Sequence, residues 1–168
     1  MVFLGDSITQ GYGVPADKCW ATKCCNYFGN SVNMGRSGGT LPDDTSKQIA
    51  QILPFMKPKY VVVTIGTNGG NTAENLAEMI ENIEQLGAIP IVNRIYRKSS
   101  STTSVNDLIA NLNVLSSRFD YATSTDNKLG SSQNTSLYLA DKVHLNETGN
   151  QVVFERFIAD CGFIDFLE

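Results

Sequence analysis

The chain has 168 residues, of which 42% are hydrophobic, and a formal net charge of −4 that comes from 13 basic and 17 acidic residues. This length and hydrophobic content fit one globular domain over residues 1–168. The acidic balance argues against a nucleic-acid partner, because binding to phosphates requires a basic surface. No apolar run approaches the roughly 18 residues of a membrane span, so no membrane partner is expected.

Apolar and amphipathic segments alternate along the chain, a pattern typical of strands and helices that follow one another. In chain order we expect a strand at 2–4, a helix at 17–28, a strand at 31–33, a helix at 42–53, a strand at 60–65, a helix at 72–86, a strand at 89–93, a helix at 105–119, a strand at 121–123 and a helix at 148–161. The β-branched run at 60–65 indicates a strand that is buried on both faces. The pattern predicts an α/β fold, namely a three-layer α/β/α sandwich around a mostly parallel, flavodoxin-like five-stranded sheet.

The helix predicted at 72–86 has well-signalled ends. Asn71 is expected to cap it, and Glu74 stands where a capping box would place its acid. Gly87 follows the last turn and is a typical stop. The apolar face is expected to consist of Leu76, Ile80, Ile83 and Leu86.

Two residues at opposite ends of the chain suggest catalysis. Ser7 follows the first predicted strand, and His144, the only histidine, ends the segment Asp-Lys-Val-His at 141–144. A serine hydroxyl needs a base to act as a nucleophile at neutral pH, and histidine is the usual base. Asp141 is placed to orient the imidazole. Each residue also has a structural interpretation: Ser7 as a turn or cap serine, Asp141 as a helix cap and His144 as an exposed loop residue.

Four short segments occur in a fixed order: Gly-Asp-Ser-Ile-Thr at 5–9, Asn-Met-Gly-Arg-Ser-Gly at 33–38, Gly-Thr-Asn at 66–68 and Asp-Lys-Val-His-Leu-Asn at 141–146. They resemble the four sequence blocks of the SGNH (GDSL-type) hydrolase family, and their residues are most similar to those of small carbohydrate acetyl esterases. Two positions depart from the family pattern. Ile8 stands where the family usually has Leu, and Gly69 stands where it usually has Asp.

The resemblance implies an acyl-enzyme mechanism with Ser7 as nucleophile, His144 as base and Asp141 as the residue that orients it, without a metal or organic cofactor. It also implies an oxyanion hole made by the N–H groups of Ser7 and Gly35 and the side chain of Asn68. Taken singly, Gly35 could be a turn glycine and Asn68 a loop asparagine. Independently of the resemblance, Ser7, Gly35 and Asn68 follow predicted strands, and ligands of open parallel sheets bind outside the carboxyl ends of the strands.

The expected substrate is an acetyl or other short acyl ester, most simply of a plant cell-wall or other polysaccharide. The chain is short and has few insertions from which to build a long acyl channel, and the loops near the predicted site are rich in Ser, Thr and Asn. Candidates for lining the pocket are Tyr12, Trp20, Arg94 and Tyr96. The alternatives are a general short-chain esterase or lysophospholipase, and a catalytically degenerate carbohydrate-binding domain whose serine and histidine lie too far apart for proton transfer.

The four cysteines are Cys19, Cys24, Cys25 and Cys161. Adjacent cysteines are a poor zinc pattern, so no metal site is expected. The cysteines are either small buried apolar residues or include a disulfide between Cys161 and the 19–25 segment, since the last helix of such a fold packs beside the first. No basic leader precedes the first apolar segment, and we expect a mature secreted protein or part of a larger extracellular one.

Overall fold

A computed structural model describes residues 1–95, 106–109 and 134–161. The strands are β1 (Val2–Gly5), β2 (Val32–Asn33), β3 (Tyr60–Thr64) and β4 (Ile89–Val92). The helices are α1 (Ser7–Gln10), α2 (Trp20–Phe28), α3 (Leu41–Asp44), α4 (Leu53–Met56), α5 (Ala73–Gln85) and α7 (Glu147–Cys161). A 3₁₀ turn covers Ala16–Lys18, and a π-helical segment covers Thr45–Ile49.

The strands form one parallel sheet in the order β2-β1-β3-β4. β1 lies between β2 and β3, with Val2 opposite both Val32 and Val61. This topology confirms the predicted α/β fold with a parallel sheet. The described residues supply four strands rather than five, and the strand predicted at 121–123 lies outside them.

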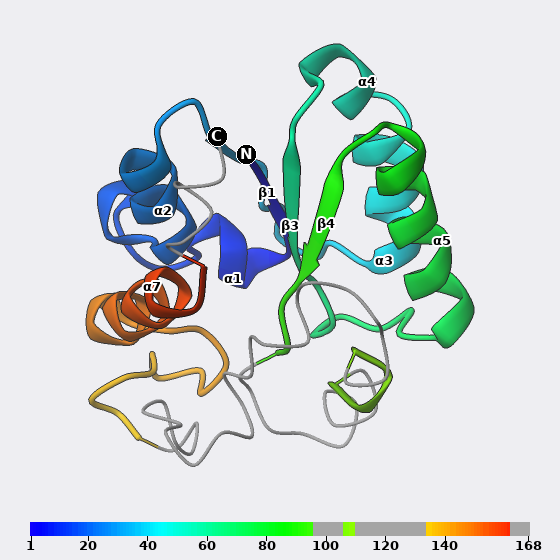
Figure 1. Ribbon diagram of the computed structural model, residues 1–168. Helices are drawn as coiled ribbons and strands as arrows, with labels where there is room; N and C mark the ends of the chain where they lie inside the picture. Colours follow the sequence, from blue (N-terminus) through cyan, green and yellow to red (C-terminus); the bar gives the residue numbers. More distant parts are fainter. Residues whose placement is uncertain (96–105, 110–133, 162–168) are drawn as a thin grey trace.

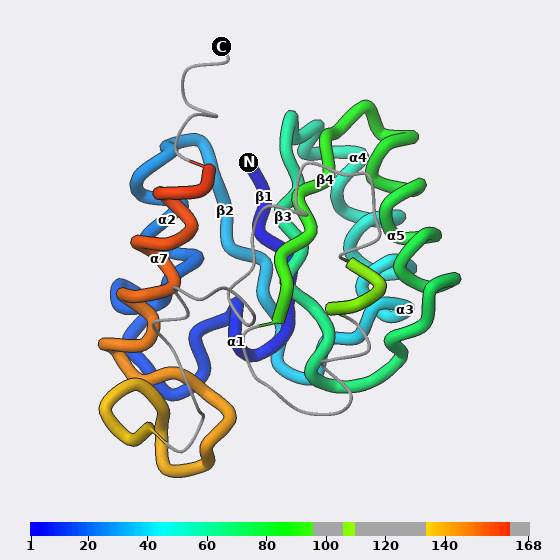
Figure 2. The backbone as a smooth tube through the Cα atoms, turned by 60° about the horizontal axis from the view of Figure 1, so that its bottom comes forward, coloured from blue at the N-terminus to red at the C-terminus, as the bar shows by residue number. Residues whose placement is uncertain are grey.

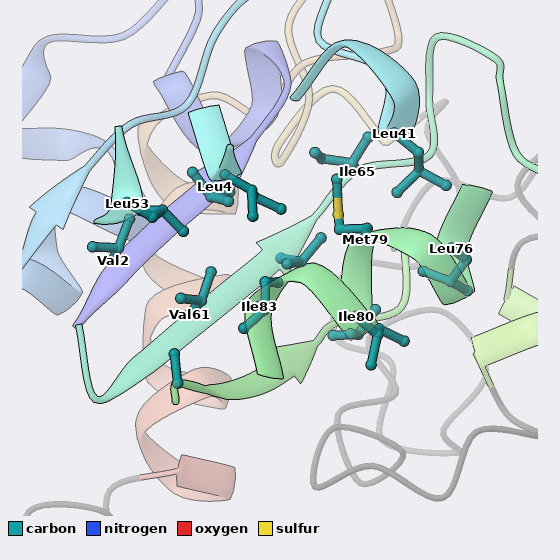
Figure 3. Close-up of a cluster of buried hydrophobic side chains, with 14 of the residues drawn as sticks. Val2, Leu4, Leu41, Leu53, Val61, Ile65, Leu76, Met79, Ile80 and Ile83 are labelled. Atoms are coloured by element: carbon teal, nitrogen blue, oxygen red, sulfur yellow. The ribbon is translucent and has the colours of Figure 1, made fainter. Parts of the chain in front are cut away.

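Helices cover both faces of the sheet, as Figures 1 and 2 show. Successive strand side chains point to opposite faces, so each strand contributes to two cores. Phe3 and Val62 pack with Trp20 of α2 and Phe157 of α7 in one cluster. The other cluster lies beneath α5, where the side chains drawn in Figure 3 meet; its labelled members include Val2, Leu4, Val61, Leu76, Met79 and Ile83. The three layers follow from this two-sided burial.

The segment predicted as one helix at 42–53 is divided in the structure. α3 begins after Thr40, whose hydroxyl accepts a hydrogen bond from the Asp43 N–H (3.4 Å), and continues into the π-helical segment. A separate helix, α4, then runs past Pro54 instead of ending before it. Proline is tolerated there because the N–H groups of a first helical turn have no intrahelical partner.

The start of α5 also differs from the prediction. Its N-cap is Thr72, whose hydroxyl accepts from the Asn75 N–H at 3.2 Å, so Glu74 does not occupy the capping-box position. Asn71 instead donates its side-chain amide to the Gly66 carbonyl at 2.7 Å. The apolar face is as predicted: Leu76, Ile80 and Ile83 are buried, and Leu86 is partly buried against the same core. Of the helix predicted at 105–119, residues 106–109 are described and helical.

The helices α2 and α7 lie side by side (Figure 2). Cys24 and Cys25 belong to α2, Cys19 directly precedes it, and Cys161 ends α7. Cys19, Cys24 and Cys161 are buried, Cys25 is partly exposed, and all four are free thiols. Their role in the structure is therefore the apolar one of the two interpretations, and no bridge joins Cys161 to the 19–25 segment.

Candidate active site

Ser7 is the first residue of α1 and directly follows the buried strand β1. Asp6 caps the helix, with its Oδ1 accepting from the Ile8 N–H at 2.9 Å. The Ser7 side chain stands at the carboxyl edge of the sheet, and the residue is 8% exposed. Its N–H belongs to the first helical turn, where intrahelical bonds leave donors unpaired. The turn thus presents a hydroxyl and an N–H group at one point.

The loop before α7 positions His144. Oδ1 of Asp141 accepts from the N–H groups of Val143 (2.9 Å) and His144 (3.0 Å), which closes a tight turn. Oδ2 of Asp141 lies 2.7 Å from Nδ1 of His144. Burial by itself raises the pKa of Asp141, but the hydrogen bonds from His144 and Val143 outweigh it and leave that pKa below its ordinary value. Asp141 is therefore a carboxylate that holds the imidazole in one orientation.

The other ring nitrogen of His144 reaches the serine. Nε2 lies 2.8 Å from Oγ of Ser7, within hydrogen-bond distance. With a proton on Nδ1 facing Asp141, Nε2 is the acceptor for the Ser7 proton. Asp141, His144 and Ser7 thus form a continuous chain of hydrogen bonds from carboxylate to hydroxyl.

The loop at residues 35–39 follows β2 and packs against α1. A Cβ on Gly35 would lie 2.3 Å from the Gln10 nitrogen, so only glycine allows this approach. The Gly35 N–H, predicted to bind the oxyanion, donates instead to Oδ1 of Asn33 at 2.9 Å. In the structure a local side chain therefore engages this donor, and the assignment of the Gly35 N–H to the oxyanion stays a prediction.

A different glycine of that loop has an uncommitted N–H. In the 35–39 loop, four of the five backbone N–H groups donate to acceptors, which lie on Asn33, Gly5, Gln10 and Arg36. The fifth is that of Gly38, which has no acceptor among the residues that the structure describes. Gly38 has a φ of +76°, which favours glycine. Gly38 is not among the oxyanion donors predicted from the sequence, although it lies in the same segment at 33–38 as Gly35.

Asn68 lies in the next loop, after β3. Its side-chain amide donates one hydrogen to the Gly39 carbonyl at 3.0 Å, which leaves the second hydrogen for another acceptor. Gly69 follows with a φ of +100°, so the residue that departs from the family pattern meets a backbone requirement that Asp would meet only with strain. The hydrogen bond from Asn71 to Gly66 closes this loop.

A buried carboxylate, that of Asp44, anchors the 35–39 loop. The sequence contains no signal for this role. Asp44 is fully buried in α3, and its Oδ1 accepts from Arg36 Nη2 and Gln48 Nε2, both at 2.9 Å. Arg36 also donates its backbone N–H to the Gly5 carbonyl at 2.8 Å. The loop is thereby joined to the end of β1 and to α3.

The four residues predicted to line the pocket lie in different environments. The Tyr12 ring lies beside the His144 ring, with centroids 4.5 Å apart. Trp20 is wrong as a pocket residue: it is 1% exposed in the core, and its indole N–H donates to the Ile8 carbonyl. An indole is large enough to serve as the centre of a core, and here α7 covers it. Arg94 is half-buried just beyond β4, and Tyr96 lies outside the described residues.

Asp6 is the second buried carboxylate near the site. It is fully buried, and burial raises its pKa above the ordinary value, although hydrogen bonds from Ile8 and Thr67 act in the opposite direction. Across the described ranges, no cluster of His, Cys, Asp and Glu has the make-up of a metal site. Within the same ranges, no helix has the length and apolarity to span a membrane.

The fold and this site define a class: an α/β protein with a parallel sheet and with a serine, a histidine and an aspartate hydrogen-bonded to one another at the carboxyl edge of that sheet. Residues 3–152 match the GDSL-like lipase/acylhydrolase family, and the chain belongs to that family. It is an ester hydrolase or acylhydrolase by this membership. Among curated protein sequences, none is significantly similar to the chain.

Solved structures share the fold at low sequence identity. The psychrotrophic esterase EstA from Pseudoalteromonas sp. superposes with a TM-score of 0.74 at 16% identity, over 96% of this chain and 95% of that one. TesA superposes with a TM-score of 0.75 at 19% identity, over 95% and 96% of the two chains. A two-domain esterase (CEX) active on acetylated mannans gives 0.71 at 16% identity, over all of this chain and 49% of that one.

Proposed function

We propose that this member of the family is a serine esterase that removes acetyl or other short acyl groups from polysaccharides, with Ser7 as nucleophile. The observation that carries the proposal is the hydrogen-bonded chain from Asp141 through His144 to Ser7, with contacts of 2.7 and 2.8 Å. A base within hydrogen-bond reach of a serine and oriented by a carboxylate is the arrangement that nucleophilic catalysis requires.

In the first half of the reaction, Oγ of Ser7 attacks the ester carbonyl carbon while Nε2 of His144 takes the hydroxyl proton. The carbonyl becomes an oxyanion in a tetrahedral intermediate. The bond to the alcohol oxygen then breaks, and the imidazolium returns its proton to that oxygen. The Asp141 carboxylate stabilises the imidazolium that exists between these two proton transfers.

In the second half, His144 takes a proton from water, and the resulting hydroxide attacks the acyl-enzyme. Ser7 leaves with a proton from the imidazolium, and the carboxylic acid departs. Donors aimed at the oxyanion each contribute about 3–4 kcal/mol to such steps. The groups that we assign to it are the Ser7 N–H, the second amide hydrogen of Asn68 and the Gly38 N–H, which replaces that of Gly35.

Two observations support a carbohydrate ester as substrate. One similar structure belongs to an esterase active on acetylated mannans. The other is the exposed aromatic ring of Tyr12 next to the imidazole. A plant cell-wall polysaccharide lies outside the cell that degrades it, and such a substrate is consistent with the secreted location expected from the sequence. The 2.8 Å between Ser7 and His144 weighs against the degenerate binding domain, which requires a longer separation.

The test is release of acetate from acetylated xylan and acetylated mannan, beside release of p-nitrophenol from its acetate and palmitate esters. Ser7→Ala is the inactive variant, and Ser46→Ala, at an exposed serine of the π-helical segment, is the matched control. Ser7-dependent release from polysaccharide and acetate ester supports the proposal. Turnover of the palmitate ester alone would favour the lysophospholipase alternative, and activity that survives Ser7→Ala would overturn the mechanism.

A further inference from the structure

Tyr12 is tied to Ser7 by a backbone hydrogen bond, and its neighbour Gly13 packs against a side chain of the loop that carries His144. Its N–H donates to the carbonyl of Ser7 at 2.9 Å, which ties it to the nucleophile's helix. The next residue, Gly13, has a φ of +81° and lies against Leu139, whose Cδ1 would be 2.4 Å from a Cβ at that position. Leu139 belongs to the loop that carries His144, and its N–H donates to the His144 carbonyl at 2.8 Å. The backbone of Tyr12 is thus joined to Ser7 and lies next to the loop that carries His144.

The side chain of Tyr12 is exposed although it has an aromatic neighbour. Its ring is tilted by 40° against the His144 ring, with 4.5 Å between centroids, and Tyr12 is 55% exposed. It belongs to neither of the two apolar cores of the described residues. A large, rigid aromatic side chain that is fixed at its backbone and open to solvent is typical of a contact surface for a ligand.

The direction of the reaction decides which part of a substrate meets this ring. The leaving alcohol oxygen must lie beside Nε2 of His144, since the imidazolium protonates it. The carbonyl oxygen points instead toward its hydrogen-bond donors, which come from Ser7 and from the loops after β2 and β3. The part of the substrate that continues beyond the alcohol oxygen therefore lies on the imidazole side, where Tyr12 is located.

We propose that Tyr12 is the platform for the alcohol portion of the substrate, and that this portion is a sugar ring. The apolar C–H face of a pyranose matches a flat aromatic ring, and its hydroxyl groups remain free for solvent. This inference rests on the proposed esterase function and deepens it, because it assigns the specificity for the alcohol to one residue. It also confines the effect of Tyr12 to acylation, since the alcohol has left before water attacks.

The experiment compares two acetyl esters that differ in the alcohol: an acetylated xylo-oligosaccharide and ethyl acetate. Tyr12→Leu removes the ring, Tyr12→Phe and Tyr12→Trp keep one, and Tyr27→Leu is the control at a tyrosine on α2 that is 48% exposed. We expect Tyr12→Leu to lower kcat/KM for the oligosaccharide relative to ethyl acetate by about tenfold, the size of a typical aromatic contact. Tyr12→Phe, Tyr12→Trp and Tyr27→Leu should keep the ratio within about twofold of wild type.

An equal loss on both esters would overturn the proposal, because it would mean that Tyr12 acts only by supporting His144. No loss on either ester would overturn it as well, because the ring would then make no contact with the substrate. A second measurement separates this inference from the esterase function: binding of the deacetylated xylo-oligosaccharide to Ser7→Ala, by calorimetry, with and without Tyr12→Leu. Weaker binding in the double variant supports the platform even if no ester is turned over, and equal binding contradicts it even if Ser7-dependent hydrolysis is established.

Discussion

Nε2 of His144 lies 2.8 Å from Oγ of Ser7, although 137 positions separate the two residues in the sequence. The contact exists because β1 delivers Ser7 to the carboxyl edge of the sheet and the turn before α7 brings the imidazole to the same place. Each partner is fixed by its own local contacts: Ser7 by the cap of α1 and His144 by Asp141. The four predictions below concern these contacts and the loops around them.

Asp141→Asn is expected to lower kcat by about 10³–10⁴-fold. The amide can still accept the N–H bonds of Val143 and His144, but its NH₂ group would face Nδ1 and favour the wrong tautomer of the imidazole. Steady-state kinetics on p-nitrophenyl acetate measures the loss. Circular dichroism should show an intact fold, and a kcat within tenfold of wild type would contradict the role assigned to Asp141.

Asp44→Asn is expected to destabilise the protein by about 1.5–3 kcal/mol, because it weakens buried hydrogen bonds from Arg36 and Gln48 to a charged group. The neighbour Asp43 also approaches Arg36, at 3.7 Å, but its side chain is 43% exposed. Asp43→Asn is therefore the matched control and should cost less than about 1 kcal/mol. Urea denaturation of both variants gives the comparison, and equal costs would contradict the anchoring role of Asp44.

Asp6→Asn is expected to change how stability depends on pH. Because burial raises the pKa of Asp6 in the folded protein, folding disfavours its ionised form. Wild type should therefore lose stability relative to the variant as the pH rises from the unfolded value, about 3.9, through the higher folded value. The variant keeps an acceptor for the Ile8 N–H and lacks this loss. Unfolding free energies measured from pH 4 to pH 7 test it, and parallel curves would show that the folded pKa is not raised.

The N–H of Gly38, and not that of Gly35, is expected to bind the oxyanion. A phosphonate attached to Ser7 places an anionic oxygen where the tetrahedral intermediate has one. In NMR spectra of this adduct, the amide protons of Ser7 and Gly38 should move downfield, while that of Gly35 stays bonded to Asn33. A downfield shift at Gly35 with none at Gly38 would restore the assignment made from the sequence.

Much of the fold followed from local sequence patterns. The strand β3 follows from a run of β-branched residues and the apolar face of α5 from helical spacing, and both were predicted correctly. The ends of helices were less predictable, because neighbouring polar residues compete for the same role. Asn71 and Thr72 could each cap α5, and the Gly66 carbonyl, which is brought close by the fold, engages Asn71. The helix predicted at 42–53 ends just before Pro54, but in the structure this proline fits the first turn of a new helix.

The sequence by itself determined the alternation of strands and helices, the order of the four segments and the identity of Ser7, His144 and Asp141 as candidates. These depend on residue type and spacing, which the chain carries directly. Only the tertiary structure decided which groups meet. It buried Trp20 in the core while leaving Tyr12 open beside the imidazole, and it committed the Gly35 N–H to Asn33 while leaving that of Gly38 unused among the described residues. A hydrogen bond or a ring contact needs two partners at the right distance, and that distance is set by the packing of segments far apart in the chain.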